Sequence, residues 1–138
     1  MVYVHLVFFG IIIPSCIVYV IVRNLCTSSS HNYWVRQYNK HTDMYDVFLD
    51  KYGPEKEILE VTLNITQQDI NRLENIRTNL YNRPTTRAVM KERYYLARKI
   101  LEVTTLQEQH KRSLNEINVA IHMYTRHINL CTYKMNNL

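Results

Sequence analysis

The chain has 138 residues, of which 46% are hydrophobic, and it carries a formal net charge of +5 at pH 7. That length suits one small domain or one elongated unit, and the apolar content argues against intrinsic disorder. Only two glycines and three prolines interrupt the chain, which is too few for the many turns of an all-β or α/β fold.

The first apolar segment runs from residue 2 to residue 22 and contains no Asp, Glu, Lys or Arg. About 20 apolar residues cross the hydrocarbon core of a bilayer, so the segment predicts a transmembrane anchor over residues 1–23. The alternative is a cleaved signal peptide, because small residues follow Leu25 where a peptidase could cut. The absence of Lys and Arg before the apolar run, and the length of that run, favour the retained anchor.

The flanks of this segment indicate its orientation. Arg23, Arg36 and Lys40 all follow it, so the positive-inside rule places the soluble part on the cytosolic side of an unidentified membrane. Asn64 begins a glycosylation sequon, which matters only if the soluble part is luminal. Cys26 and Cys131 lie outside the apolar run and could form one disulfide.

Residues 24–30, which include three consecutive serines, are expected to be a short linker and a helix cap. Residues 31–138 are expected to form a long antiparallel helical hairpin. Its first arm begins with an aromatic stripe at alternating spacings of four and three, which is typical of a buried helix face: Trp34, Tyr38, His41, Tyr45, Phe48 and Tyr52. Gly53-Pro54 should then kink this arm.

The next helical segment, residues 55–82, has an apolar face wider than a coiled coil of two helices needs. Its seam comprises Leu59, Leu63, Thr66, Ile70, Leu73, Arg77 and Leu80. Four further apolar residues fall outside that seam and are candidate contacts for a partner: Ile58, Val61, Ile65 and Ile76.

Asn82 to Thr85 should form the turn, with Pro84 at the first position of the following helix. From Val89 to Leu138 apolar residues recur at heptad spacing, which predicts a long helix packed against the first arm. If the hairpin closes at this turn, residue i faces residue 166 − i, so Leu63 meets Val103. Gln107 and His110 interrupt the seam, either as a polar layer that fixes the register or as a local gap. The alternative fold is a three-helix bundle in which the chain reverses at Gly53-Pro54.

Residues 72–99 are strongly basic, with eight Lys and Arg residues against Glu74 and Glu92. The candidate contact residues of this basic tip are Arg83, Arg87, Lys91 and Arg98. Such a tip could bind anionic lipid or an acidic protein surface. Nucleic acid is a third candidate, but the sequence contains no recognised nucleic-acid-binding module, which disfavours it.

No phosphate loop, nucleophile elbow or zinc-protease pattern occurs, so we expect neither an enzyme nor a metal or cofactor site. The sequence predicts a single-pass membrane protein that acts as a helical scaffold or tether and binds a partner protein or itself. Two alternatives remain at this point: a secreted or luminal helical ligand released by signal cleavage, and a binder of nucleic acid or anionic lipid held at a membrane.

Overall fold

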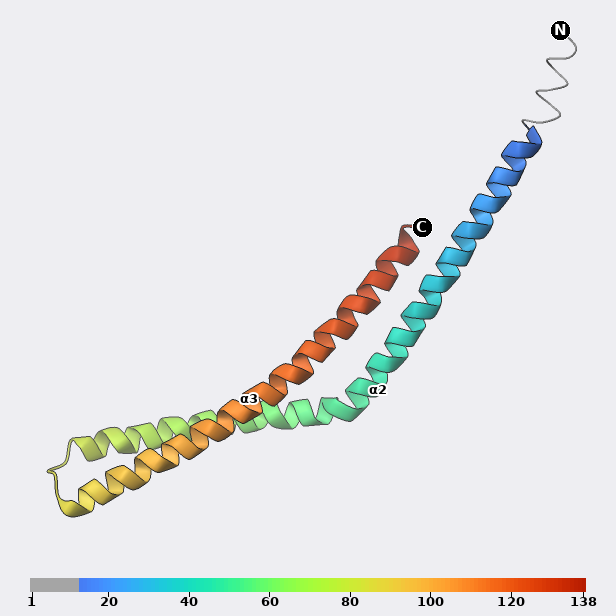
Figure 1. The fold of residues 1–138 in the computed structure, drawn as a ribbon. Helices are drawn as coiled ribbons and strands as arrows, with labels where there is room; N and C mark the ends of the chain where they lie inside the picture. Colours follow the sequence, from blue (N-terminus) through green and yellow to red (C-terminus); the bar gives the residue numbers. More distant parts are fainter. Residues whose placement is uncertain (1–12) are drawn as a thin grey trace, which may run out of the picture. The chain divides into compact units, whose positions relative to one another are not determined.

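The computed structural model describes residues 13–138, with side chains from Ile17 onwards. The described chain consists of two long helices, α2 over Ile13–Tyr81 and α3 over Arg87–Asn136, and contains no strand (Figure 1). The predicted all-helical fold with two long helices packed as a hairpin is confirmed. The chain falls into two units, which among the described residues comprise 13–45 with 124–138, and 46–123. Each unit is considered separately below.

The heptad seam of α3 is buried along its length. Every seam residue from Val89 to Met135 is buried or half-buried, whereas most other residues of α3 in this range are exposed. The seam of α2 behaves in the same way, from Trp34 to Leu80. The four-and-three spacing of the sequence therefore identified the two contact faces correctly.

In the unit of residues 46–123, α2 and α3 pack side by side up to the turn. Leu80, Leu96 and Ile100 form a small buried cluster, against which Leu73 packs. The green-to-yellow end of α2 and the yellow-to-orange start of α3 show this pairing (Figure 1). Because these side chains come from both helices, their burial holds the closed end of the hairpin together.

The turn lies where the sequence predicts it, but the start of α3 does not. Thr86 caps the helix, because its Oγ1 accepts a 3.2 Å hydrogen bond from the amide of Val89. A cap at this position places the first helical residue at Arg87 rather than at Pro84. The expectation for Pro84 was wrong because Arg83, which would precede it as the cap, has no short side-chain oxygen with which to accept such a bond.

The register of the hairpin also differs from the expectation. The 166 − i rule places Gln67 opposite Lys99, whereas Gln67 is hydrogen-bonded to Gln107, two helical turns further along α3. The rule assumed that α3 begins at Pro84 and pairs at once with α2. Instead Arg93, already two turns into α3, lies level with the end of α2 and bonds to the carbonyl of Leu80.

In the unit of residues 13–45 and 124–138 the expected register is nearly right. The ring of His41 stacks on that of His127, with centroids 5.1 Å apart, two residues from the position that the rule gives. Tyr45, expected opposite Ile121, stacks instead on Tyr124 at 5.7 Å. Aromatic pairs of this kind stabilise the pairing of the two helices beyond the area that they bury.

α2 continues through Gly53 and Pro54 without interruption. The three-helix bundle, which required a chain reversal there, is therefore wrong. Pro54 has no amide to bond to the carbonyl of Asp50, and this missing bond is the physical basis of the predicted kink. The long helix tolerates the loss because the flanking turns bury apolar side chains on both sides of it.

Residues 24–30 are helical and belong to α2, so the expectation of a linker and a helix cap there was wrong. The segment contains neither Gly nor Pro, and hydroxyl side chains can be satisfied within a helix. Thr27 shows how, because its Oγ1 donates a 2.8 Å hydrogen bond to the carbonyl of Arg23 one turn earlier.

Within residues 13–138, no helix is both long and apolar enough to cross a bilayer. Residues 2–12 of the expected anchor lie outside the described residues. Residues 13–22 form the start of α2, and from Ile17 to Val22 their side chains are about half exposed or more. The transmembrane anchor over residues 1–23 stays a prediction from the sequence.

Candidate interaction surfaces

A polar contact crosses the hairpin in the unit of residues 46–123. Gln107, only 5% exposed, donates a 2.8 Å hydrogen bond from Nε2 to Oε1 of Gln67. Gln67 in turn donates to Oδ1 of Asn71 at 3.0 Å. Of the two polar seam residues, Gln107 thus pairs across the interface, whereas the buried Nδ1 of His110 has no hydrogen-bond partner among the described residues. Gln107 is the residue placed to fix the register.

Arg93 caps the C-terminal end of α2, a role that the sequence analysis missed. Its guanidinium donates to the carbonyls of Leu80, Tyr81 and Arg83 at distances of 2.9 to 3.4 Å. It also lies 4.6 Å from the centroid of the Tyr81 ring. A cation at a helix C-terminus satisfies carbonyls that have no partner within the helix and complements the helix dipole. The available signal was a charged residue at a seam position two turns after the start of α3.

The four apolar residues predicted to contact a partner all lie exposed on α2: Ile58, Val61, Ile65 and Ile76, at 65%, 56%, 54% and 40%. At 100° per residue they occupy one face about 60° wide, distinct from the seam that faces α3. Val47, 68% exposed, falls on the same face, although the sequence analysis omitted it. The spacing of eleven residues between Val47 and Ile58, repeated between Ile65 and Ile76, was the signal for it. We call these five residues the outer row of α2.

The predicted basic residues of the tip, Arg83, Arg87, Lys91 and Arg98, are all exposed. Arg98 forms a 3.3 Å ion pair with Glu102, and within the described chain no ion pair involves the other three. Large apolar side chains are also exposed beside these charges, at the end of α2 and the start of α3: Tyr81, Met90, Tyr94 and Tyr95.

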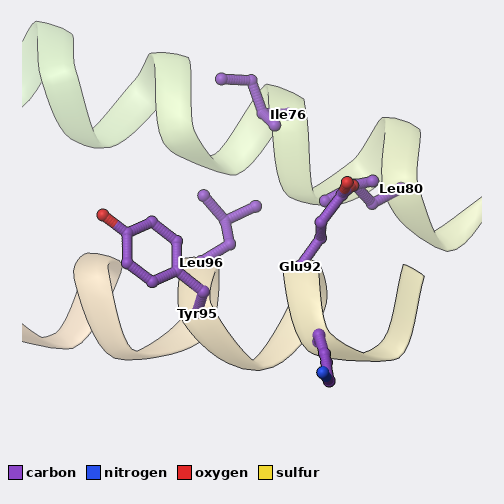
Figure 2. Close-up of a pocket in the computed structure, with 6 residues that line it drawn as sticks. Ile76, Leu80, Glu92, Tyr95 and Leu96 are labelled. Carbon is purple, nitrogen blue, oxygen red and sulfur yellow. The ribbon is translucent and has the colours of Figure 1, made fainter. Parts of the chain in front are cut away.

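A shallow groove of about 410 Å³ lies between the end of α2 and the start of α3. Its lining residues are Ile76, Leu80, Lys91, Glu92, Tyr95 and Leu96. Figure 2 shows Leu96 and Tyr95 rising from α3 towards Ile76 and Leu80 on α2. The groove is mostly apolar and presents one carboxylate and one amine, so it lacks the converging set of acid, base and nucleophile that catalysis needs.

Cys26 and Cys131, the two cysteines of the predicted disulfide, differ in their exposure to solvent. Cys26 is exposed, Cys131 is buried, and both are free thiols, so the predicted disulfide is wrong. Cys131 lies one turn beyond His127 and so pairs with α2 near Gln37, roughly 16 Å along the helix from Cys26 and beyond disulfide reach. Burial also raises the pKa of the Cys131 thiol.

Asn64, the predicted glycosylation acceptor, is exposed, but Thr66 of its sequon is only 8% exposed. The Oγ1 of Thr66 donates to the carbonyl of Thr62 at 2.7 Å. The sequon therefore lies across the edge of the seam, with its hydroxyl turned into the hairpin.

Among the side chains that the structure describes, no group of three or more His, Cys, Asp or Glu residues is arranged to hold a metal ion. Comparison of the chain with protein-family models, with curated proteins and with solved structures found no match.

Proposed function

We propose that this chain is a membrane-anchored helical scaffold, and that the outer row of α2 packs against a further helix in a partner protein or in a second copy of the chain. One observation carries the proposal. The seam of α2 is already occupied by α3, yet the outer row presents a second apolar stripe to solvent, in which Ile58, Val61 and Ile65 lie close together and Val47 and Ile76 lie eleven residues to either side.

The chemistry of the outer row suits a helical partner. Val and Ile are stiff side chains that lose little conformational freedom when they are covered. Completing the burial of each one contributes roughly 1 kcal/mol, so five of them offset a substantial part of the entropy lost on association. Their eleven-residue spacing corresponds to about 3.67 residues per turn, which keeps the row nearly straight along the helix and matches a second helix lying beside it.

Residues 1–23 supply the membrane anchor in this proposal, and Arg23, Arg36 and Lys40 direct the soluble part to the cytosolic side. Anchoring the chain in a membrane restricts its orientation and raises its local concentration. Both effects favour the weak lateral contacts that a row of five apolar side chains can make.

A photo-crosslinking scan of the full chain in its membrane tests the proposal. A photoreactive residue placed at Val61 or Ile65 should give a discrete adduct, either a dimer of the chain or one defined heterologous product. The matched control places it at Glu57 or Gln68, which are exposed on the flank of the same face that lies away from the seam. Equal yields at all four positions, or none at Val61 and Ile65, contradict the proposed contact.

Extraction of the same membranes at alkaline pH tests the anchor separately. The full chain should stay with the lipid pellet, and a C-terminal tag should be digested by protease added to the cytosolic face of sealed vesicles. Release of the chain into the supernatant, with a new N-terminus near Ser28, would support a ligand released by signal cleavage instead.

A further inference from the structure

The first turns of α3 carry two parallel rows of exposed side chains. Met90, Tyr94 and Leu101 form an apolar row, exposed at 59%, 74% and 67%. Arg87, Lys91 and Arg98 repeat the same spacings of four and seven and form a cationic row. At 3.6 residues per turn, each row covers about 40° of the helix, and their centres lie about 60° apart. An apolar stripe flanked by cations is the pattern of a helix that lies in a membrane interface.

The charges of the cationic row are available to a partner. In the described chain, no ion pair involves Arg87 or Lys91, and the pair between Arg98 and Glu102 is an exposed one, which contributes little. Arg93 is different, because its guanidinium is already bonded to the carbonyls at the end of α2. Neighbouring Arg83, in the turn, adds a further exposed positive charge.

The aromatic residues beside these rows have the chemistry of a bilayer interface as well. Tyr81 and Tyr95 are exposed at 62% and 69% on either side of the turn. Tyrosine is enriched at the level of lipid headgroups, where the ring contacts apolar atoms and the hydroxyl remains hydrated. Cations, tyrosines and a Met–Leu row thus occupy one end of the hairpin.

We infer that this tip docks on an anionic bilayer surface, with the cationic row on the headgroups and the apolar row inserted at the acyl boundary. Together with the proposed N-terminal anchor, a docking tip makes the protein a tether between its own membrane and a second, anionic one. This tethering role rests on the proposed anchor, whereas docking of the tip does not. The charge complementarity selects an anionic over a neutral surface, and the exposed Met90 and Leu101 select a bilayer over nucleic acid. Phosphate contacts of a nucleic acid would leave both of these side chains in water.

The test uses the full chain in nanodiscs of neutral lipid, mixed with acceptor vesicles and separated by flotation. The chain should float with vesicles rich in phosphatidylserine and not with vesicles of phosphatidylcholine alone. Since each cation near an anionic surface contributes about fivefold to partitioning, the triple variant Arg87→Gln, Lys91→Gln, Arg98→Gln should lower it on the order of 100-fold. Higher salt should weaken it as well.

A matched control removes the same charge elsewhere on α3, with Arg112→Gln, Arg126→Gln and Lys134→Gln, and should change partitioning by less than about fivefold. A second variant, Met90→Ser, Tyr94→Ser, Leu101→Ser, keeps every charge and should still reduce flotation. Circular dichroism checks that each variant is helical. Equal losses in the charge variant and its control, flotation with neutral vesicles, or tighter binding to an RNA oligomer than to anionic vesicles would overturn docking.

Failure of the anchor is distinguishable from failure of docking. A chain that does not co-elute with neutral nanodiscs lacks the proposed anchor, and its tip can then be tested on the same vesicles without the nanodisc. A chain that enters nanodiscs but does not float with anionic vesicles retains its anchor and has no docking tip.

Discussion

Gln107 and Gln67, forty residues apart in the chain, join the two helices of the hairpin through a single 2.8 Å hydrogen bond between their side chains. Gln107 is buried at a seam position, whereas Gln67 is exposed at the edge of the interface. A buried polar side chain at such a position lowers stability and selects one register, because any other register leaves it without a partner.

Replacing Gln107 with leucine should therefore raise the free energy of unfolding by about 1 kcal/mol. A buried leucine contributes about 1.5–3 kcal/mol, against about 0.5–1.5 kcal/mol for the lost hydrogen bond, and Gln67 stays solvated. The variant should also self-associate more readily, because the register is no longer selected. Urea denaturation and sedimentation measure the two effects. Gln109→Leu, at an exposed position, is the control, and a loss of stability in Gln107→Leu would contradict this interpretation.

Replacing Arg93 with alanine should destabilise the closed end of the hairpin by roughly 1.5–3 kcal/mol, the range for hydrogen bonds to a charged group. Its guanidinium satisfies carbonyls at the end of α2 that have no partner within the helix. Hydrogen exchange should speed up in the last turn of α2. Arg87→Ala, a change at an exposed arginine six residues earlier, should alter the free energy of unfolding by less than about 0.5 kcal/mol. Equal effects of the two substitutions would show that Arg93 is no cap.

Replacing Gly53 with alanine should stabilise α2 by about 0.5–1 kcal/mol, because glycine costs that much inside a helix. A methyl group at this position meets no atom within 4 Å, so nothing opposes the gain. Pro54→Ala restores a backbone hydrogen bond and should stabilise by up to about 3 kcal/mol. Thermal unfolding followed by circular dichroism measures both changes. A lower midpoint in either variant would mean that the glycine–proline step is needed for packing.

Cys131 should react with iodoacetamide far more slowly than Cys26 in the folded chain, once Cys16 is replaced by serine. Burial raises the pKa of the Cys131 thiol, and only the thiolate reacts. Since the folded state prefers the protonated thiol, this group's contribution to stability is present below the unfolded thiol pKa. It falls as the pH rises through the folded value. Mass spectrometry of the alkylated peptides gives the two rates, and equal rates would show that Cys131 is accessible.

Sequence reasoning identified both contact faces because the apolar positions of α2 and α3 repeat at regular spacing, and burial follows that repeat. It identified Ile58 and Ile65 as exposed apolar residues for the same reason, since both lie on a different face of α2 from the seam. The position of the turn was predictable from Asn82 and Pro84, because proline and asparagine are typical of helix ends.

The register was not predictable from that pattern. A heptad repeat presents nearly the same apolar face after a shift of seven residues, so two registers about one heptad apart bury similar side chains. Two polar contacts distinguish these registers, the hydrogen bond between Gln67 and Gln107 and the cap formed by Arg93, and the apolar pattern predicts neither. In that pattern Gln67 is an ordinary surface residue, and Arg93 only interrupts the seam. The helical residues 24–30 were missed because serine is typical of caps and linkers, although a helix tolerates it where hydroxyls bond to the preceding turn.

The measurement that tests the account most directly is a crosslinking comparison of the register, because the contact between Gln67 and Gln107 and the cap formed by Arg93 both depend on it. Two double-cysteine variants of the full chain, with its native cysteines replaced by serine, are treated with a short bismaleimide. The pair Gln67→Cys with Gln107→Cys should crosslink within one chain, and the pair Gln67→Cys with Lys99→Cys, two turns closer to the turn, should not. The opposite result would restore the uniform register and would move Arg93 away from the end of α2.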